Sequence, residues 1–195
     1  VSDPKVLDVP VERVSGVQAP GSLSGSGTIF AVDHNAEASL ATLRFRLKSA
    51  AFEAAEEPFE AEGRKFHRGS FLIRNAMAAD VQSAASELGL PILALASAPS
   101  VKTHPVRAPR IALVHSWLST QDEGWWRQAF DDLKVPYESI STQTVAKAAD
   151  LSARFDVLVF PPVGRGAQAI VSGMPMWGNP LPWKVTPLTP NLGKT

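Results

Sequence analysis

The stretch "RIALVHSWLSTQDEGWWRQAF", residues 110–130, decides the fold of the second half of the chain. Its apolar run Ile111–His115 is typical of a strand that is buried on both faces of a parallel sheet. The residues that follow predict a helix from about Asp122 to Leu133, with Ser119 or Thr120 as N-cap and acidic side chains in the first turn. A strand followed at once by a helix indicates an α/β layer.

Two interpretations of this helix start remain open. Trp126, Phe130 and Leu133 recur at i, i+4 and i+7, which predicts an apolar stripe facing the sheet, while Trp125 covers a neighbouring element. The second interpretation is a ligand site, because ligands of open α/β sheets bind outside the carboxyl ends of the strands. The residues expected at such a site are His115, Asp122, Glu123 and Trp125. The two carboxylates disfavour phosphate as the ligand.

Downstream, "VPYESI" predicts a short strand, "TVAKAADLSARF" a helix and "DVLVFPPV" a very apolar strand. Together with residues 110–130 they predict a partial doubly wound, flavodoxin-like parallel sheet with right-handed crossovers. A sheet of three strands exposes long edges. We therefore expect this domain to be incomplete, and the remainder of a longer polypeptide or a second chain to complete the sheet.

Upstream, strands "GTIFAVDH", "GSFLIRN" and "PILALAS" alternate with two predicted helices and indicate a small α/β segment, in which we expect helices to pack around parallel strands. The first helix has Asn35 available as N-cap, and Gly89 ends the second. The acidic stretch "FEAAEEPFEAEGRKF" is interpreted as a solvated connection that turns at Gly63. The predicted divisions are an irregular lead-in (1–26), the small α/β segment (27–98), a Pro-rich linker (99–110) and the flavodoxin-type domain (111–195).

Composition limits the possible functions. Of the 195 residues 45% are hydrophobic, enough for a core, and the 19 basic residues equal the 19 acidic ones. This balance argues against nucleic acid as a partner. The chain has no cysteine, so neither a thiolate nucleophile nor a disulfide is possible. Its apolar runs are shorter than a transmembrane helix needs.

Other candidate motifs carry alternatives. His34 and Glu37 form an H-x-x-E, which could share a zinc ion with His104 or His115 as a distant third ligand, or could simply begin a helix. Ser70 follows a glycine but lacks the G-x-S-x-G elbow, and "GRGAQA" lacks the spacing of a dinucleotide loop. The basic stretch "GRKFHRGSFLIRN" is interpreted as a half-exposed strand.

The stretches "HSWLSTQDEGWWRQAFDDLKVPYESI", "LSARFDVLVFPP" and "MPMWGNPLPWKVTPLTPN" resemble the region that follows the peptidase domain in large bacterial zinc carboxypeptidase-like proteins. The resemblance implies a glutamine-amidotransferase-like, flavodoxin-type domain, preceded by a smaller α/β joining segment in "GSFLI…AADVQSAASELGLPI". It also implies an exported protein whose zinc belongs to a separate peptidase domain, with no cofactor in this region. The amidotransferase-like fold usually carries a nucleophilic cysteine, which this chain lacks.

Three functions follow. The first is a non-catalytic accessory region of a zinc carboxypeptidase-like protein, which provides a scaffold or contacts to substrates and partners. The alternative is a small-molecule or glycan binding module of amidotransferase-like fold. The second alternative is a zinc-dependent hydrolase that uses His34 and Glu37.

Overall fold

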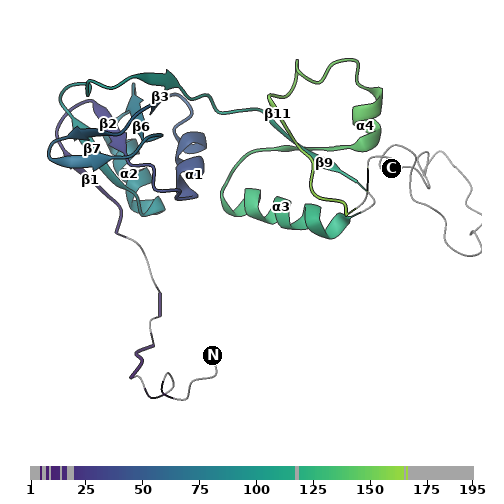
Figure 1. Cartoon of the computed structure of the whole chain (residues 1–195), viewed down its shortest axis with the longest axis horizontal. Coiled ribbons are helices and arrows are strands. Elements are labelled where there is room, and N and C mark those ends of the chain that lie inside the picture. The colour runs from purple at the N-terminus through teal and green to yellow at the C-terminus, as the bar shows by residue number, and fades with distance from the viewer. Residues whose placement is uncertain are drawn as a thin grey trace, which may run out of the picture.

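The computed structural model describes residues 5, 8, 10–13, 15–16, 20–116, 119–164 and 166. These residues form a six-stranded sheet, a three-stranded sheet and a two-stranded hairpin, with four helices (Figure 1). The elements, in chain order, are β1 (Ser22–Gly25), β2 (Ile29–Val32), α1 (Ser39–Arg46), β3 (Ala51–Ala55), β4 (Phe59–Ala61), β5 (Arg64–Phe66), β6 (Phe71–Arg74), α2 (Ala78–Leu88), β7 (Pro91–Leu95), β8 (Thr103–Pro105), β9 (Ile111–His115), α3 (Thr120–Asp132), β10 (Glu138–Ser141), α4 (Thr142–Lys147) and β11 (Val157–Val159).

The six-stranded sheet has the order β1-β7-β2-β6-β3-β8 and is mostly antiparallel. Strand β2 pairs antiparallel with β6 and β7, and β3 pairs antiparallel with β6 and β8. Among the described strands of this sheet, only β1 and β7 run parallel. The expectation of a parallel layer in the first half was therefore wrong. Hydrophobic periodicity identifies strands, but it does not encode the direction in which they pair.

The core of this sheet follows the alternation of side chains along each strand. Phe30 and Val32 on β2 pack with residues of α1 and α2, among them Leu43 and Val81. The residue between them, Ala31, belongs to a second cluster that includes Phe66 of the β4–β5 hairpin. The helices thus cover one face and the hairpin the other, as strand geometry requires. Helix α2 ends as predicted, because Gly89 adopts the left-handed conformation with φ of 68°.

Several local predictions in the first half need correction. The expected connection after residue 50 contains β3 and the β4–β5 hairpin, although its turn does lie at Gly63, whose φ is 72°. The expected lead-in contains β1, and the expected Pro-rich linker contains the edge strand β8. Glycine and proline have low β propensity, and the pairing of β1 with β7 and of β8 with β3 overrides that propensity here.

The three-stranded sheet is parallel, as predicted, with β9 between β10 and β11. Its small core includes Ala112, Val114, Ile140 and Phe155. The predicted helix over 144–155 was wrong in extent, because α4 ends at Lys147.

The apolar stripe predicted on α3 is not buried. Trp126 is 40% exposed and packs edge-on against Phe130, with ring centroids 5.7 Å apart. Phe130 in turn contacts Tyr137, at a centroid distance of 5.4 Å. Within α3, all of whose residues are described, only Glu123 is buried. A polar group therefore holds this helix against the sheet where aromatic rings were expected.

Two anchored residues bound the segment between the sheets. Val106 donates its backbone N–H to the carbonyl of Phe52 in β3, at 2.8 Å. Arg110 donates its backbone N–H to Asp156 Oδ2 at 2.8 Å, and its guanidinium donates to both carboxylate oxygens at 2.9–3.0 Å. Only residues 107–109 lie between these anchors.

The edge strand β11 carries apolar side chains that are exposed. Val157, Leu158 and, just after the strand, Phe160 are 41%, 47% and 41% exposed. Successive residues of a strand point to opposite faces, so both faces of β11 present apolar surface. The stretch "MPMWGNPLPWKVTPLTPN" lies outside the described residues. Among the described helices, none has the length and apolar character needed to cross a membrane.

Candidate functional site

A buried carboxylate joins the carboxyl end of β9 to α3. His115 is the last residue of β9, and Glu123 lies in the first turn of α3 with 3% of its surface exposed. The His115 imidazole Nδ1 bonds to Glu123 Oε2, and Arg127, one turn further along the helix, donates Nε–H to Glu123 Oε1 at 2.7 Å. One carboxylate therefore holds two side chains in place.

The protonation of Glu123 reflects this environment. Burial acts to raise the pKa of Glu123, because a carboxylate loses hydration away from water. Hydrogen bonds from His115 and Arg127, with the positive charge of the guanidinium, lower the pKa and outweigh burial. The pKa of Glu123 thus lies below its ordinary value, and the group is an anion at neutral pH.

Arg127 extends the cluster to the neighbouring strand. Its Nη2 donates to Ser139 Oγ of β10 at 2.6 Å. The guanidinium is thereby fixed at both ends, by a carboxylate of its own helix and by a hydroxyl of the sheet. A fixed guanidinium keeps its remaining donors in one orientation.

These side chains border an open pocket of about 460 Å³ that extends along the whole of β10, from Glu138 to Ser141, and reaches His115 at the carboxyl end of β9. Its volume lies within the range of about 300–1,000 Å³ that small-molecule sites occupy. The lining residues are His115, Arg127, Glu138, Ser139, Ile140, Ser141 and Thr144.

The far wall of the pocket is the junction between β10 and α4. Ser141 caps α4, because its Oγ accepts from the Thr144 backbone N–H at 3.1 Å. The hydroxyls of Ser141 and Thr144 also bond to each other, at 3.1 Å. Glu138, at the start of β10, forms an ion pair with Arg154. Every charged side chain of the wall thus has a counter-charge within the protein.

The structure brings together some of the residues predicted from the sequence and separates others. His115 lines the pocket, and Glu123 bonds to two of the lining residues. Asp122 instead accepts a hydrogen bond from Ser119 Oγ and does not line the pocket. Trp125 is 63% exposed and does not line it either.

Sequence reasoning missed the pocket residues Arg127, Ser139, Ser141 and Thr144. One signal was present, because Glu123 and Arg127 have the i, i+4 spacing of an ion pair on a helix. The three hydroxyl residues belong to an ordinary polar stretch, and only the parallel pairing of β10 with β9 places them beside His115.

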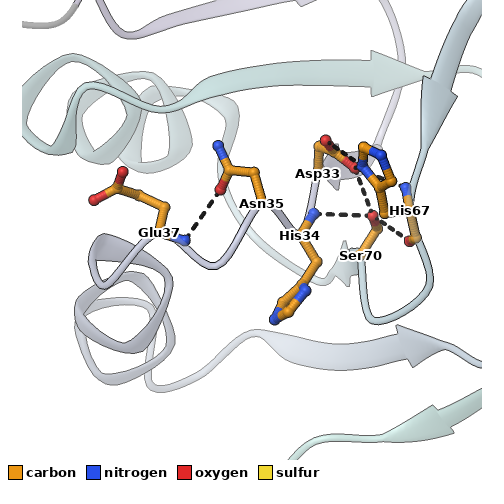
Figure 2. Close-up of polar contacts among 6 residues, drawn as sticks. All are labelled: Asp33, His34, Asn35, Glu37, His67 and Ser70. Carbon is orange, nitrogen blue, oxygen red and sulfur yellow. Dashed lines mark hydrogen bonds and ion pairs between the residues drawn. The ribbon is translucent and has the colours of Figure 1, made fainter.

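The H-x-x-E pair lies on the loop between β2 and α1. His34 and Glu37 extend in different directions (Figure 2). The Glu37 N–H donates to Asn35 Oδ1 at 3.2 Å, so Asn35 shapes this loop, while the N-cap position of α1 is Ala38. Within the described ranges, no group of three His, Cys, Asp or Glu side chains is placed to hold a metal ion.

A second polar cluster ties this loop to the turn before β6 (Figure 2). Asp33 Oδ1 accepts from the backbone N–H of His67 at 2.7 Å and from Ser70 Oγ at 3.0 Å. Ser70 is fully buried, accepts from the His34 N–H at 3.0 Å and lies 2.6 Å from the His67 carbonyl. The Ser70 hydroxyl thus bonds to a carboxylate and to the backbone, and it stabilises two loops.

Comparison of the chain with protein-family models, with curated proteins and with solved structures gives no match in any of the three.

Proposed function

We propose that the chain is a non-catalytic binding region whose parallel-sheet part binds a small polar molecule. The observation that carries this proposal is the pocket of about 460 Å³ that extends along β10 and reaches His115 at the carboxyl end of β9. Ligands of open α/β sheets bind at this end of the strands. The sequence interpretation of a binding module at His115 is retained, with Arg127, Ser139 and Thr144 added.

The hydrogen bonds that fix the lining side chains favour binding. Arg127 is fixed by Glu123 and by Ser139, and Ser141 is fixed by the first turn of α4. Side chains that are already ordered lose little conformational entropy when a ligand arrives. The pocket is therefore organised before binding.

The binding test uses amide resonances of the protein during titration with a collection of small polar compounds. At least one compound is expected to shift the amides of residues 138–144, and Thr144→Val is expected to weaken it at least about fivefold, as the loss of a hydrogen bond predicts. Thr120→Val removes a hydroxyl that does not line the pocket and should leave affinity unchanged. If every compound leaves these amides unshifted, the proposal is wrong.

We further propose that this region is an accessory part of a zinc carboxypeptidase-like protein and that its second half is of flavodoxin type. The order β10-β9-β11 places the first strand of the unit between the second and the third, which is how flavodoxin-like sheets begin. The proposal rests on this order and on the sequence resemblance. The complete reading frame tests it, since a zinc peptidase domain with its H-x-x-E and distant histidine is expected upstream. A reading frame without a peptidase domain would contradict it.

The edge strand β11 supports a partner for the sheet. Its exposed Val157 and Leu158 have the character of a strand buried on both faces of a parallel sheet. We propose that another part of a longer polypeptide, or a second chain, pairs with this edge. Hydrogen exchange of the β11 amides should then be slower in the full-length protein than in this chain, and equal exchange would exclude the pairing.

A further inference from the structure

We propose that the ligand of the pocket is a neutral molecule with several hydroxyl groups, such as a sugar ring. This inference rests on the proposed binding function and specifies its ligand class. It follows from the charges of the lining residues, from their hydroxyl groups and from the hydrogen bonds that these groups already make within the protein.

The charges of the wall are balanced within the protein. The guanidinium of Arg127 lies 2.6 Å from the Glu123 carboxylate, and the Glu138 carboxylate is paired with Arg154. The lining therefore carries one cation, Arg127, and one anion, Glu138, and each is paired with a counter-ion of the protein. Because no net charge faces the ligand, the pocket lacks the attraction that selects phosphates or ammonium ions.

The binding groups are of the kind that recognise hydroxyls. Ser139, Ser141 and Thr144 provide three hydroxyls, and Ile140 is the single apolar residue of the lining. Ser139 Oγ accepts from Arg127, so its own proton remains for a ligand oxygen. A hydroxyl of the ligand both donates and accepts, and it can therefore bond to serine, carboxylate and guanidinium alike.

The lining disfavours anions, cations and apolar ligands, each for a different reason. An anion would approach the Glu138 carboxylate, and the Thr144 amide at the start of α4 already donates to Ser141. A cation would approach the Arg127 guanidinium. An apolar ligand would remove three hydroxyls from water without replacing their hydrogen bonds, which is unfavourable.

The experiment titrates the whole chain with methyl glucoside, methyl galactoside, N-acetylglucosamine and inositol, and in parallel with inorganic phosphate and methylammonium, while amide resonances are recorded. A neutral probe is expected to shift the amides of residues 138–144. Its affinity should change less than about twofold when NaCl rises from roughly 0.05 to 0.5 M, because ionic attraction contributes little. If phosphate or methylammonium shifts these amides and no neutral probe does, the ligand class is wrong while the binding function stands. If no compound shifts them, the binding function itself fails.

Two variants sharpen the test. Thr144→Val should weaken the neutral probe while Thr120→Val, outside the lining, should not. Arg154→Gln removes the counter-charge of Glu138. Protonated glucosamine should then gain affinity relative to N-acetylglucosamine by about twofold, a small factor because the pair is exposed. If the two probes keep their wild-type affinity ratio in Arg154→Gln, the balanced charge is not what selects the ligand.

Discussion

The carboxylate of Glu123 bonds to the imidazole of His115, and this contact attaches the first turn of α3 to the last residue of β9. The two tryptophans of the helix are exposed to a large extent, so the attachment does not depend on them. The same carboxylate orients Arg127, which lines the pocket. One side chain therefore contributes both to the position of the helix and to the geometry of the pocket.

Glu123→Gln is expected to lower the free energy of unfolding by about 2 kcal/mol, because two hydrogen bonds to a buried anion become weaker or are lost. Urea denaturation measures the change. Asp132→Asn, the same change of group at an exposed position near the end of the same helix, should alter stability by less than about 0.5 kcal/mol. Equal effects of the two substitutions would show that the Glu123 contacts contribute no stability.

Acid should destabilise the protein through the same group. The pKa of Glu123 is lower in the folded state, so its contribution to stability is complete above the ordinary carboxylate value of about 4.3 and is lost as the pH falls through the folded value. The pKa of Asp33 is lowered as well, by hydrogen bonds from His67 and Ser70 that outweigh its burial. Urea midpoints should fall between about pH 5 and pH 2, and less steeply in Glu123→Gln. Parallel curves for the two proteins would contradict this assignment.

The pKa of Asp156 offers a direct measurement at the start of the parallel sheet. Hydrogen bonds from the Arg110 side chain and backbone lower this pKa to about 2. In Arg110→Met the side-chain bonds are absent, and the pKa should rise toward its ordinary value, part of the way because the backbone bond remains. Carboxylate resonances followed by NMR report the value. Lys147→Met, which removes a cation that has no contact with Asp156, serves as the control.

Two glycines should respond to alanine in opposite ways. Gly27 has a φ of 145°, and a Cβ there would lie 2.0 Å from the Leu95 carbonyl oxygen, so Gly27→Ala should cost about 2–3 kcal/mol. Gly124 lies within α3 with no atom near a new Cβ, and Gly124→Ala should stabilise the protein by up to about 1 kcal/mol. Thermal unfolding distinguishes them. A loss of stability in Gly124→Ala would contradict its position on the exposed side of a helix.

How far the sequence predicted the fold can be seen at individual elements. "IALVH" was predicted as a parallel strand and is one. Strands β2 and β6 are also apolar and are also followed by helices, yet they pair antiparallel, so this pattern does not determine strand direction. "SLSG", the strand β1, carries no β-strand signal and owes its conformation to pairing with β7. Strand direction in the first sheet was not predictable, since the apolar pattern of a strand does not encode the direction in which it pairs.

The residues of the candidate site also fall into two groups, those that local sequence predicted and those that only strand pairing brings together. His115 and Glu123 were predicted because they flank the end of one strand, which is local information. Ser139 and Thr144 come close to His115 only through the pairing of β10 with β9, which joins residues distant in sequence. Trp125 was included on the basis of its residue type, but the geometry of the helix leaves it outside the lining.

Only residues 107–109 separate Val106 from Arg110. Val106 is hydrogen-bonded to β3, and Arg110 is hydrogen-bonded to Asp156. One of these three, Pro109, has a fixed φ, so few torsions can change there. The two sheets are held close together by this short tether and by the hydrogen bond that Thr42 Oγ1 of α1 donates to the Leu133 carbonyl after α3, at 2.6 Å. A molecule that touches both would find its second contact at high local concentration, and binding to one sheet would already bring the other within reach.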